Sequence, residues 1–113
     1  MRRLTDLRAW PGGILLGAVL ALVPAVLSAE THRVVIERFA FVPAELSIRP
    51  GDTVRFVNRD LVPHAATDGE GRWDTGTLSL GAAASVTFEA AGTFPYVCIF
   101  HPSMRARIRV VPH

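Results

Sequence analysis

The feature that most constrains this chain is a series of short stretches in which apolar and polar residues alternate, separated by turn-forming residues. Alternation with a period of two places every second side chain on one face of a β-strand. Turn signals such as Pro50-Gly51 and Ala90-Ala91-Gly92 separate these stretches. The predicted strands cover residues 32–39, with a continuation or kink to 41, and residues 45–49, 52–58, 65–67, 84–89, 93–97 and 105–110. About seven short strands without a convincing helix among them predict an all-β sandwich or barrel.

The beginning of the chain differs from this pattern and predicts a secretory signal peptide. Three arginines precede an apolar run, and small residues follow it. A membrane anchor is the alternative, but the run from Ile14 to Leu27 is shorter than the roughly 20 apolar residues of a membrane-spanning helix. Pro24 also interrupts it. The expected division is a signal peptide at residues 1–29 and one domain at residues 30–113, exported to the periplasm and without stable membrane association after cleavage.

The charge of the expected domain argues against nucleic acid as a partner. From Glu30 onward, nine arginines face nine aspartates and glutamates, and there is no lysine. Binding to a phosphate backbone requires an excess of basic residues. The near neutrality of the domain therefore excludes nucleic-acid binding from the expected functions.

Cysteine usage points to a metal. Exported proteins usually pair their cysteines in disulfides, but this chain has only Cys98. His101 and Met104 follow it at steps of three residues, and His64 ends a predicted loop after the 52–58 strand. Two imidazoles, one thiolate and one thioether form the donor set of blue-copper sites. His32 and His113 lie near the ends of the expected domain, and we interpret them as ordinary surface residues.

Each of these residues also has a simpler interpretation. Cys98 alone could be a small buried apolar residue, Met104 could fill the core, and either histidine could be a polar group near a turn. Packing alone, however, does not require all three residue types in a Cys-x2-His-x2-Met run. Zinc rarely accepts methionine, and covalent haem needs two cysteines. A Cys-His nucleophile pair would need an orienting third group and an oxyanion site. Copper fits the donor set best, and no enzyme activity is expected.

The motifs together resemble the cupredoxin family. They are Phe41-x-Pro43, Pro50-Gly51-Asp52-Thr53-Val54, Asn58-x-Asp60-x-x-Pro63-His64 and Gly92-Thr93-Phe94-x-Tyr96-x-Cys98-x-x-His101-Pro102-x-Met104. Within the family, the short Cys-x2-His-x2-Met loop is similar to that of the amicyanins. The resemblance implies a Greek-key β-sandwich of seven to eight strands with one type 1 copper ion. It implies His64, Cys98 and His101 as equatorial ligands and Met104 as the long axial ligand.

The resemblance also implies roles for residues around the copper. Asn58 would tie the His64 loop to the Cys98 loop, and the edge of His101 would be the exit for the electron. Pro63, Phe100 and Pro102 would form an apolar docking rim, with ordinary loop packing as the alternative. This chain departs from the family pattern at Ile99, where many relatives have a hydroxyl residue, and at Phe100, where amicyanin-like loops often have proline.

The function that follows is transfer of single electrons by a monomer, in transient contact with redox proteins of the dehydrogenase or cytochrome type. Alternatives are a periplasmic copper carrier that delivers the ion and an interaction module without metal. A delivering protein would often expose clusters of methionine or histidine, which the expected domain lacks. Arg105, Arg107 and Arg109 share one face of the last strand. They form either a solvated face or a surface that steers an acidic partner.

Overall fold

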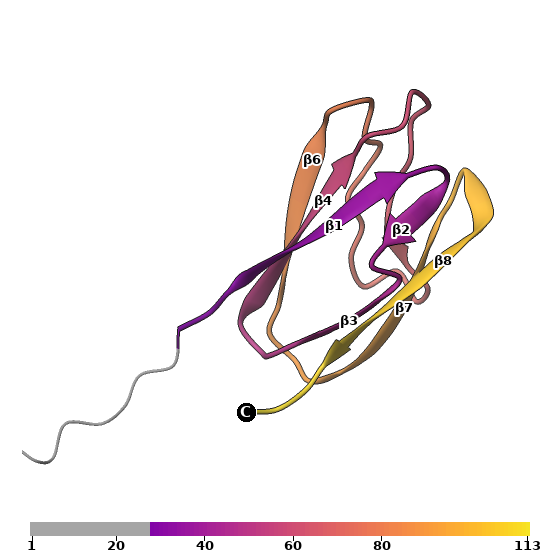
Figure 1. Cartoon of the computed structure of the whole chain (residues 1–113). Coiled ribbons are helices and arrows are strands. Elements are labelled where there is room, and N and C mark those ends of the chain that lie inside the picture. The colour runs from indigo at the N-terminus through magenta and orange to yellow at the C-terminus, as the bar shows by residue number, and fades with distance from the viewer. Residues whose placement is uncertain (1–27) are drawn as a thin grey trace, which may run out of the picture.

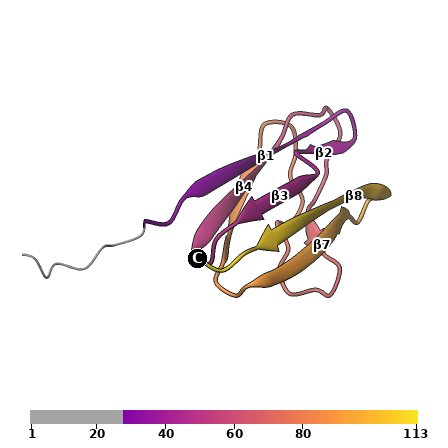
Figure 2. The same cartoon turned by 60° about the horizontal axis from the view of Figure 1, so that its bottom comes forward.

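The computed structural model describes residues 28–113, in which eight β-strands form two sheets and there is no α-helix. The predicted signal peptide lies outside these residues except for Ser28 and Ala29. In residues 28–113 there is accordingly no helix able to cross a membrane. The all-β prediction is confirmed, and the arrangement is a Greek-key sandwich (Figures 1 and 2).

The first sheet has the strand order β2-β1-β4-β6 and the second the order β3-β8-β7-β5. The first consists of β1 (Thr31–Glu37), β2 (Ala40–Val42), β4 (Asp52–Asn58) and β6 (Ala83–Phe88). The second consists of β3 (Glu45–Ile48), β5 (Thr67–Asp68), β7 (Gly92–Cys98) and β8 (His101–Val110). The pairs β1–β4 and β3–β8 are parallel, and all other neighbours are antiparallel. Each sheet is therefore mixed.

One turn was not predicted, and one predicted turn joins strands of different sheets. The predicted 32–39 strand ends at Glu37, and the chain reverses through Arg38 and Phe39 into β2, so a hairpin replaces the expected continuation. The Pro50-Gly51 turn leads from β3 in one sheet to β4 in the other. Gly51 has φ = 94° there, a conformation that costs glycine little. The turn is thus a corner between the sheets.

The core lies between the two sheets and follows the predicted alternation. On β8, Met104, Ile108 and Val110 are buried, whereas the three intervening arginines are exposed. Aromatic rings fill the centre: the Phe56 and Trp73 ring centroids lie 5.6 Å apart, and Trp73 and Tyr96 lie 5.4 Å apart. Trp73 thereby fixes the long β5–β6 connection on the core.

Strand directions bring several connections to one end of the sandwich. The β1–β2 turn and the tip of the β7–β8 hairpin lie close together there, while the C-terminus lies at the other end (Figures 1 and 2). The loop after β4 reaches the same end as the hairpin tip, as the contact between His64 and Cys98 shows. This end holds the candidate metal-binding residues.

Candidate metal centre

The tip of the β7–β8 hairpin supplies three of the four candidate ligands. Cys98 is the last residue of β7, His101 is the first residue of β8, and Met104 lies three residues further along β8. The strand register shifts between Val97 and Cys98. Such an irregularity changes the direction of a side chain relative to the regular sheet. Because Cys98 already pairs with His101, the hairpin is tighter than the loop expected from the sequence.

His64 comes from the connection between β4 and β5, where backbone hydrogen bonds fix its position. Its N–H donates to the Leu78 carbonyl at 3.0 Å, and the Leu78 N–H donates to the His64 carbonyl at 2.7 Å. The side chain of His64 is completely buried. A buried imidazole in a fixed loop can present a nitrogen in one orientation.

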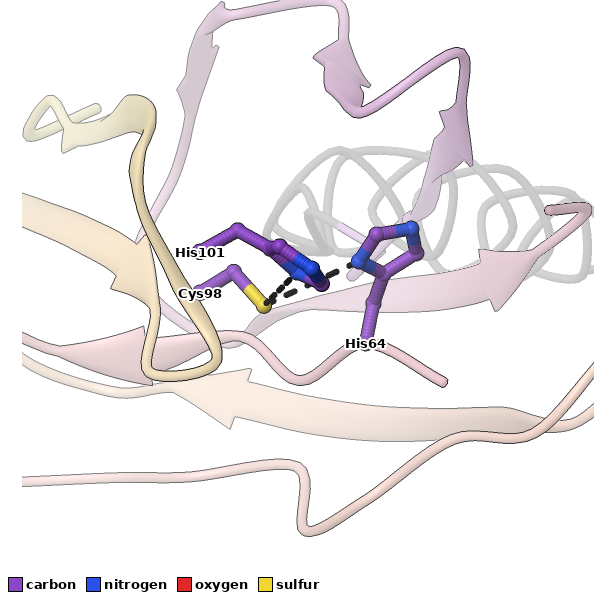
Figure 3. A group of neighbouring side chains, drawn as sticks. All are labelled: His64, Cys98 and His101. Atoms are coloured by element: carbon purple, nitrogen blue, oxygen red, sulfur yellow. Dashed lines mark hydrogen bonds between the residues drawn. The ribbon is translucent and has the colours of Figure 1, made fainter. Parts of the chain in front are cut away.

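The structure brings His64, Cys98 and His101 together, with their donor atoms turned toward one another (Figure 3). The Sγ atom of Cys98 lies 3.8 Å from Nδ1 of His64 and 3.8 Å from Nδ1 of His101. Metal–sulfur and metal–nitrogen bonds of about 2.3 and 2.0 Å at angles near 120° give a sulfur–nitrogen separation of about 3.7 Å. The three donors therefore fit one ion.

Burial and a hydrogen bond to the sulfur set the environment of the candidate ligands. Cys98 is fully buried, Met104 is 3% exposed, and His101 is partly exposed. The Cys98 sulfur also accepts a hydrogen bond from the N–H of Ala65 at 3.4 Å. Hydrogen bonds to the sulfur and an apolar surrounding are the features that tune the redox potential of a copper–thiolate centre. The cluster is thus shielded from water except at the partly exposed side chain of His101.

Asp60 orients the His64 ring and was not assigned a role by the sequence. Its Oδ2 atom lies 2.8 Å from Nε2 of His64, which leaves Nδ1 to face the sulfur. Burial opposes ionisation of Asp60, but the N–H groups of Phe39 and Arg38 together with the His64 side chain outweigh it and lower the pKa of this carboxyl. A carboxylate behind a ligating imidazole fixes its orientation and tautomer. Asp60 belongs to the Asn58-x-Asp60-x-x-Pro63-His64 motif, but in a loop a four-residue spacing does not predict a contact.

Phe39 is a second residue that the sequence did not identify. Its ring contacts His64 and His101 edge to face, with centroid separations of 5.2 and 5.0 Å. Arg38 and Phe39 both have positive φ angles, 53° and 56°. Such angles cost about 1–2 kcal/mol per residue outside glycine. The Asp60 carboxylate compensates by accepting both of their N–H groups, at 2.7 and 2.9 Å.

The expected role of Asn58 needs a correction. Its Nδ2 atom donates to the carbonyls of Val62 and Leu78 at 3.0 and 2.8 Å, and its Oδ1 atom accepts the N–H of Asp60 at 2.9 Å. Within residues 28–113 it makes no hydrogen bond to the Cys98 loop. Asn58 therefore ties the His64 loop to the residue 78 segment, and the apolar side chain of Ile99 offers it no hydrogen-bond partner.

A soft sulfur and two imidazole nitrogens, buried at one end of a Greek-key sandwich, define a copper protein of the cupredoxin class. The chain belongs to the copper-binding proteins of the plastocyanin/azurin family, whose family model matches residues 29–111. Copper is accordingly its cofactor. The predicted likeness to the amicyanins is confirmed by the comparisons with individual proteins.

Two amicyanins are among the most similar curated proteins. The chain is 35% identical to that of Paracoccus denitrificans over an alignment of 80 positions that covers 66% of this chain and 61% of the relative. It is 31% identical to that of Paracoccus versutus over an alignment of 87 positions that covers 73% of this chain and 66% of the relative. The match thus spans a little less than two thirds of either relative.

Solved structures agree with this assignment. A variant amicyanin in its reduced state superimposes with a TM-score of 0.68 at 31% identity, covering 75% of this chain and 86% of the other. A purple cupredoxin from Nitrosopumilus maritimus superimposes with a TM-score of 0.65 at 26% identity, covering 71% of this chain and 99% of the other. Both likenesses include most of residues 28–113.

Proposed function

We propose that the protein transfers single electrons in the periplasm as a monomer, and that His64, Cys98, His101 and Met104 hold its copper ion. The observation that carries the proposal is the pair of equal 3.8 Å distances from the Cys98 sulfur to the two imidazole Nδ1 atoms. The signal-peptide pattern of residues 1–29 supports export. Membership of a copper-binding family supports the metal.

The residues around the ion suit electron transfer. A bound copper ion supplies a one-electron redox couple. Asp60 and Phe39 hold the two imidazoles, and the hairpin holds Cys98 and Met104, so the ligands resist movement when the charge of the site changes. Burial of Cys98 and His64 excludes water and outside ligands from the ion. Such a site favours exchange of an electron over exchange of a ligand.

An apolar surface around His101 offers a place for a redox partner. A shallow hollow there is lined by Val62, Pro63, Thr77, Phe100 and His101. Ile99 and Phe100, at the hairpin tip, are 55% and 47% exposed. We call this surface the His101 patch. It contains Pro63 and Phe100 of the expected docking rim, while Pro102 is exposed but does not line the hollow. Transient contacts between redox proteins are small, so we expect a dehydrogenase or cytochrome to dock here.

Delivery of copper is the alternative function. It requires that a receiving protein reach the ion and replace its ligands one by one. His64 and Cys98 have no exposed surface, and only His101 is partly accessible. The geometry therefore supports electron transfer over delivery.

The test compares the rate of electron transfer to the protein with the rate of copper loss from it. Copper-loaded protein is mixed with a reduced haem protein and, separately, with a strong copper chelator. We expect rapid oxidation of the haem protein, by one electron per chain, while copper stays bound through the chelator experiment. Transfer of copper to the chelator as fast as electrons are exchanged would contradict the proposal.

Variants in the His101 patch separate docking from the metal site. Phe100→Ser should slow electron transfer several-fold without changing the visible spectrum, because it removes apolar contact area. Val111→Ser is a matched control, since Val111 is 42% exposed and follows β8 at the opposite end of the sandwich. Equal transfer rates in both variants would remove the patch from the proposal.

A further inference from the structure

A second group of metal-binding side chains lies at the end of the sandwich opposite Cys98. Glu30, His32 and Asp52 place an imidazole and two carboxylates together, with their donor atoms within 4.8 Å of one another. The Nε2 atom of His32 lies 2.9 Å from Oδ2 of Asp52 and 3.9 Å from Oε2 of Glu30. The sequence alone gave no reason to associate them, because Asp52 is 20 residues from His32.

The parallel pairing of β1 with β4 creates this group. Thr31 lies opposite Thr53 and His32 opposite Val54, so the start of β1 meets the start of β4. The Asp52 carboxylate is nearly buried and accepts the N–H groups of Glu30 and Arg49 at 2.9 and 3.0 Å. A carboxylate held before an ion arrives reduces the entropy cost of binding.

The surroundings of the group leave room for an ion and further ligands. A hollow of about 340 Å³ is lined by the three residues together with Ser47, Ile48, Arg49 and Val111. A neighbouring hollow is shared by Glu30, Asp52 and His113, so the last histidine of the chain borders the same place. The two carboxylates outweigh the single guanidinium of Arg49, which hydrogen-bonds to the Pro112 carbonyl. The net charge favours a cation.

We propose that Glu30, His32 and Asp52 form a second metal site, which binds a borderline divalent cation of the Zn²⁺ type. Two ligands at about 2.0 Å from a tetrahedral ion lie about 3.3 Å apart. The observed 2.9 and 3.9 Å separations lie on either side of this value. Imidazole with carboxylates suits zinc, whereas soft copper prefers the thiolate at the other end.

The expected consequence of this site is structural. An ion held by Glu30, His32 and Asp52 would join the beginning of β1 to the beginning of β4. Because an ion that binds only the folded chain stabilises it, zinc should raise the melting temperature. The proposal is independent of electron transfer at the other end of the sandwich.

The test is a calorimetric titration of Zn²⁺ into the copper-loaded protein, whose thiolate site is already filled. We expect one zinc ion per chain, an unchanged visible spectrum and a higher melting temperature. His32→Gln and Glu30→Gln should each weaken zinc binding at least about tenfold, because each removes one of three ligands. Glu37→Gln removes a carboxylate at the end of β1, whereas Glu30 and His32 lie at its beginning, and this variant should bind zinc as the unchanged protein does.

Two results would overturn the proposal. One is the absence of a zinc-binding event, or equal affinity in His32→Gln and the unchanged protein. The other is loss of binding in His113→Ala with retention in His32→Gln, which would place the ion on the chain end. The visible spectrum of each copper-loaded variant shows whether it has folded, so a misfolded variant is recognised.

Discussion

The imidazole of His64 is held from behind by Asp60, with 2.8 Å between Nε2 and Oδ2. The same carboxylate accepts the N–H groups of Arg38 and Phe39 in the β1–β2 turn. Phe39 in turn contacts the rings of both His64 and His101. One side chain thus connects a strained turn, a buried imidazole and the packing over the metal-binding cluster.

Asp60→Ala should weaken copper binding about 10–100-fold, the usual effect of removing a carboxylate behind a ligating histidine. The His64 ring loses its orienting partner, and the Arg38–Phe39 turn loses the acceptor of its two N–H groups. Competition with a chelator of known affinity measures the change. Glu89→Ala, which removes an exposed carboxylate, is the control and should bind copper normally. Equal affinity in the two variants would show that Asp60 does not position His64.

Met104→Leu should keep the copper but raise the reduction potential, because the weak axial sulfur that favours Cu(II) is lost. The substitution conserves volume and should cost less than about 1.5 kcal/mol of unfolding free energy. Potentiometry of the coloured protein measures the change. Leu46→Met makes the reverse exchange in β3, where Leu46 packs against the core, and should leave the potential unchanged. An unchanged potential in Met104→Leu would remove Met104 from the site.

Protonation of Asp52 should contribute to the loss of stability of the protein in acid. The N–H of Glu30, the His32 side chain and the N–H of Arg49 lower the pKa of Asp52 from 3.8 to about 2. A folded-state pKa below the unfolded one stabilises the chain above the unfolded value, and this stabilisation is lost as the pH falls from about 4 to about 2. Asp52→Asn should therefore melt below the unchanged protein at pH 5, and the difference should narrow at pH 2. A difference of the same size at both pH values would contradict this.

Arg105 and Arg109 should accelerate electron transfer if the partner is acidic. Both are exposed on β8, whereas Arg107 lies 2.9 Å from the Glu45 carboxylate. Replacing Arg105 and Arg109 by glutamine should slow association with an acidic redox protein several-fold at low salt, with a smaller effect at high salt. Stopped-flow kinetics at two ionic strengths measures this. Arg55→Gln, on the other sheet, is the control. Rates that do not depend on salt would leave these arginines as a solvated face.

Much of the fold was predictable because its signals are local. Residues 52–58 alternate between polar and apolar side chains and are flanked by turn-forming residues. They form β4 with the predicted bounds. The hairpin at Arg38 and Phe39 was missed because neither residue is typical of positive φ. The Asp60 carboxylate that holds this turn lies more than 20 residues away. Long-range contacts of this kind leave no local pattern in the sequence.

The candidate site was predictable to a similar extent. The spacing of Cys98, His101 and Met104 is local, and His64 was identified by its proline and the loop before it. The structure brings Cys98, His64 and His101 together. Phe39 contacts both imidazoles because the β1–β2 hairpin and the β7–β8 hairpin meet at one end of the sandwich. The spacing of residues in the sequence does not predict such a contact.

The visible and electron-spin-resonance spectrum of the copper-loaded protein, with Cys98→Ser beside it, tests the central claim most directly. A thiolate bound to Cu(II) gives an intense colour, so the unchanged protein should be strongly coloured. Cys98→Ser should bind copper weakly and lack this colour. A colourless copper-loaded protein, or a variant that keeps the same spectrum, would contradict the assignment of Cys98 to the metal.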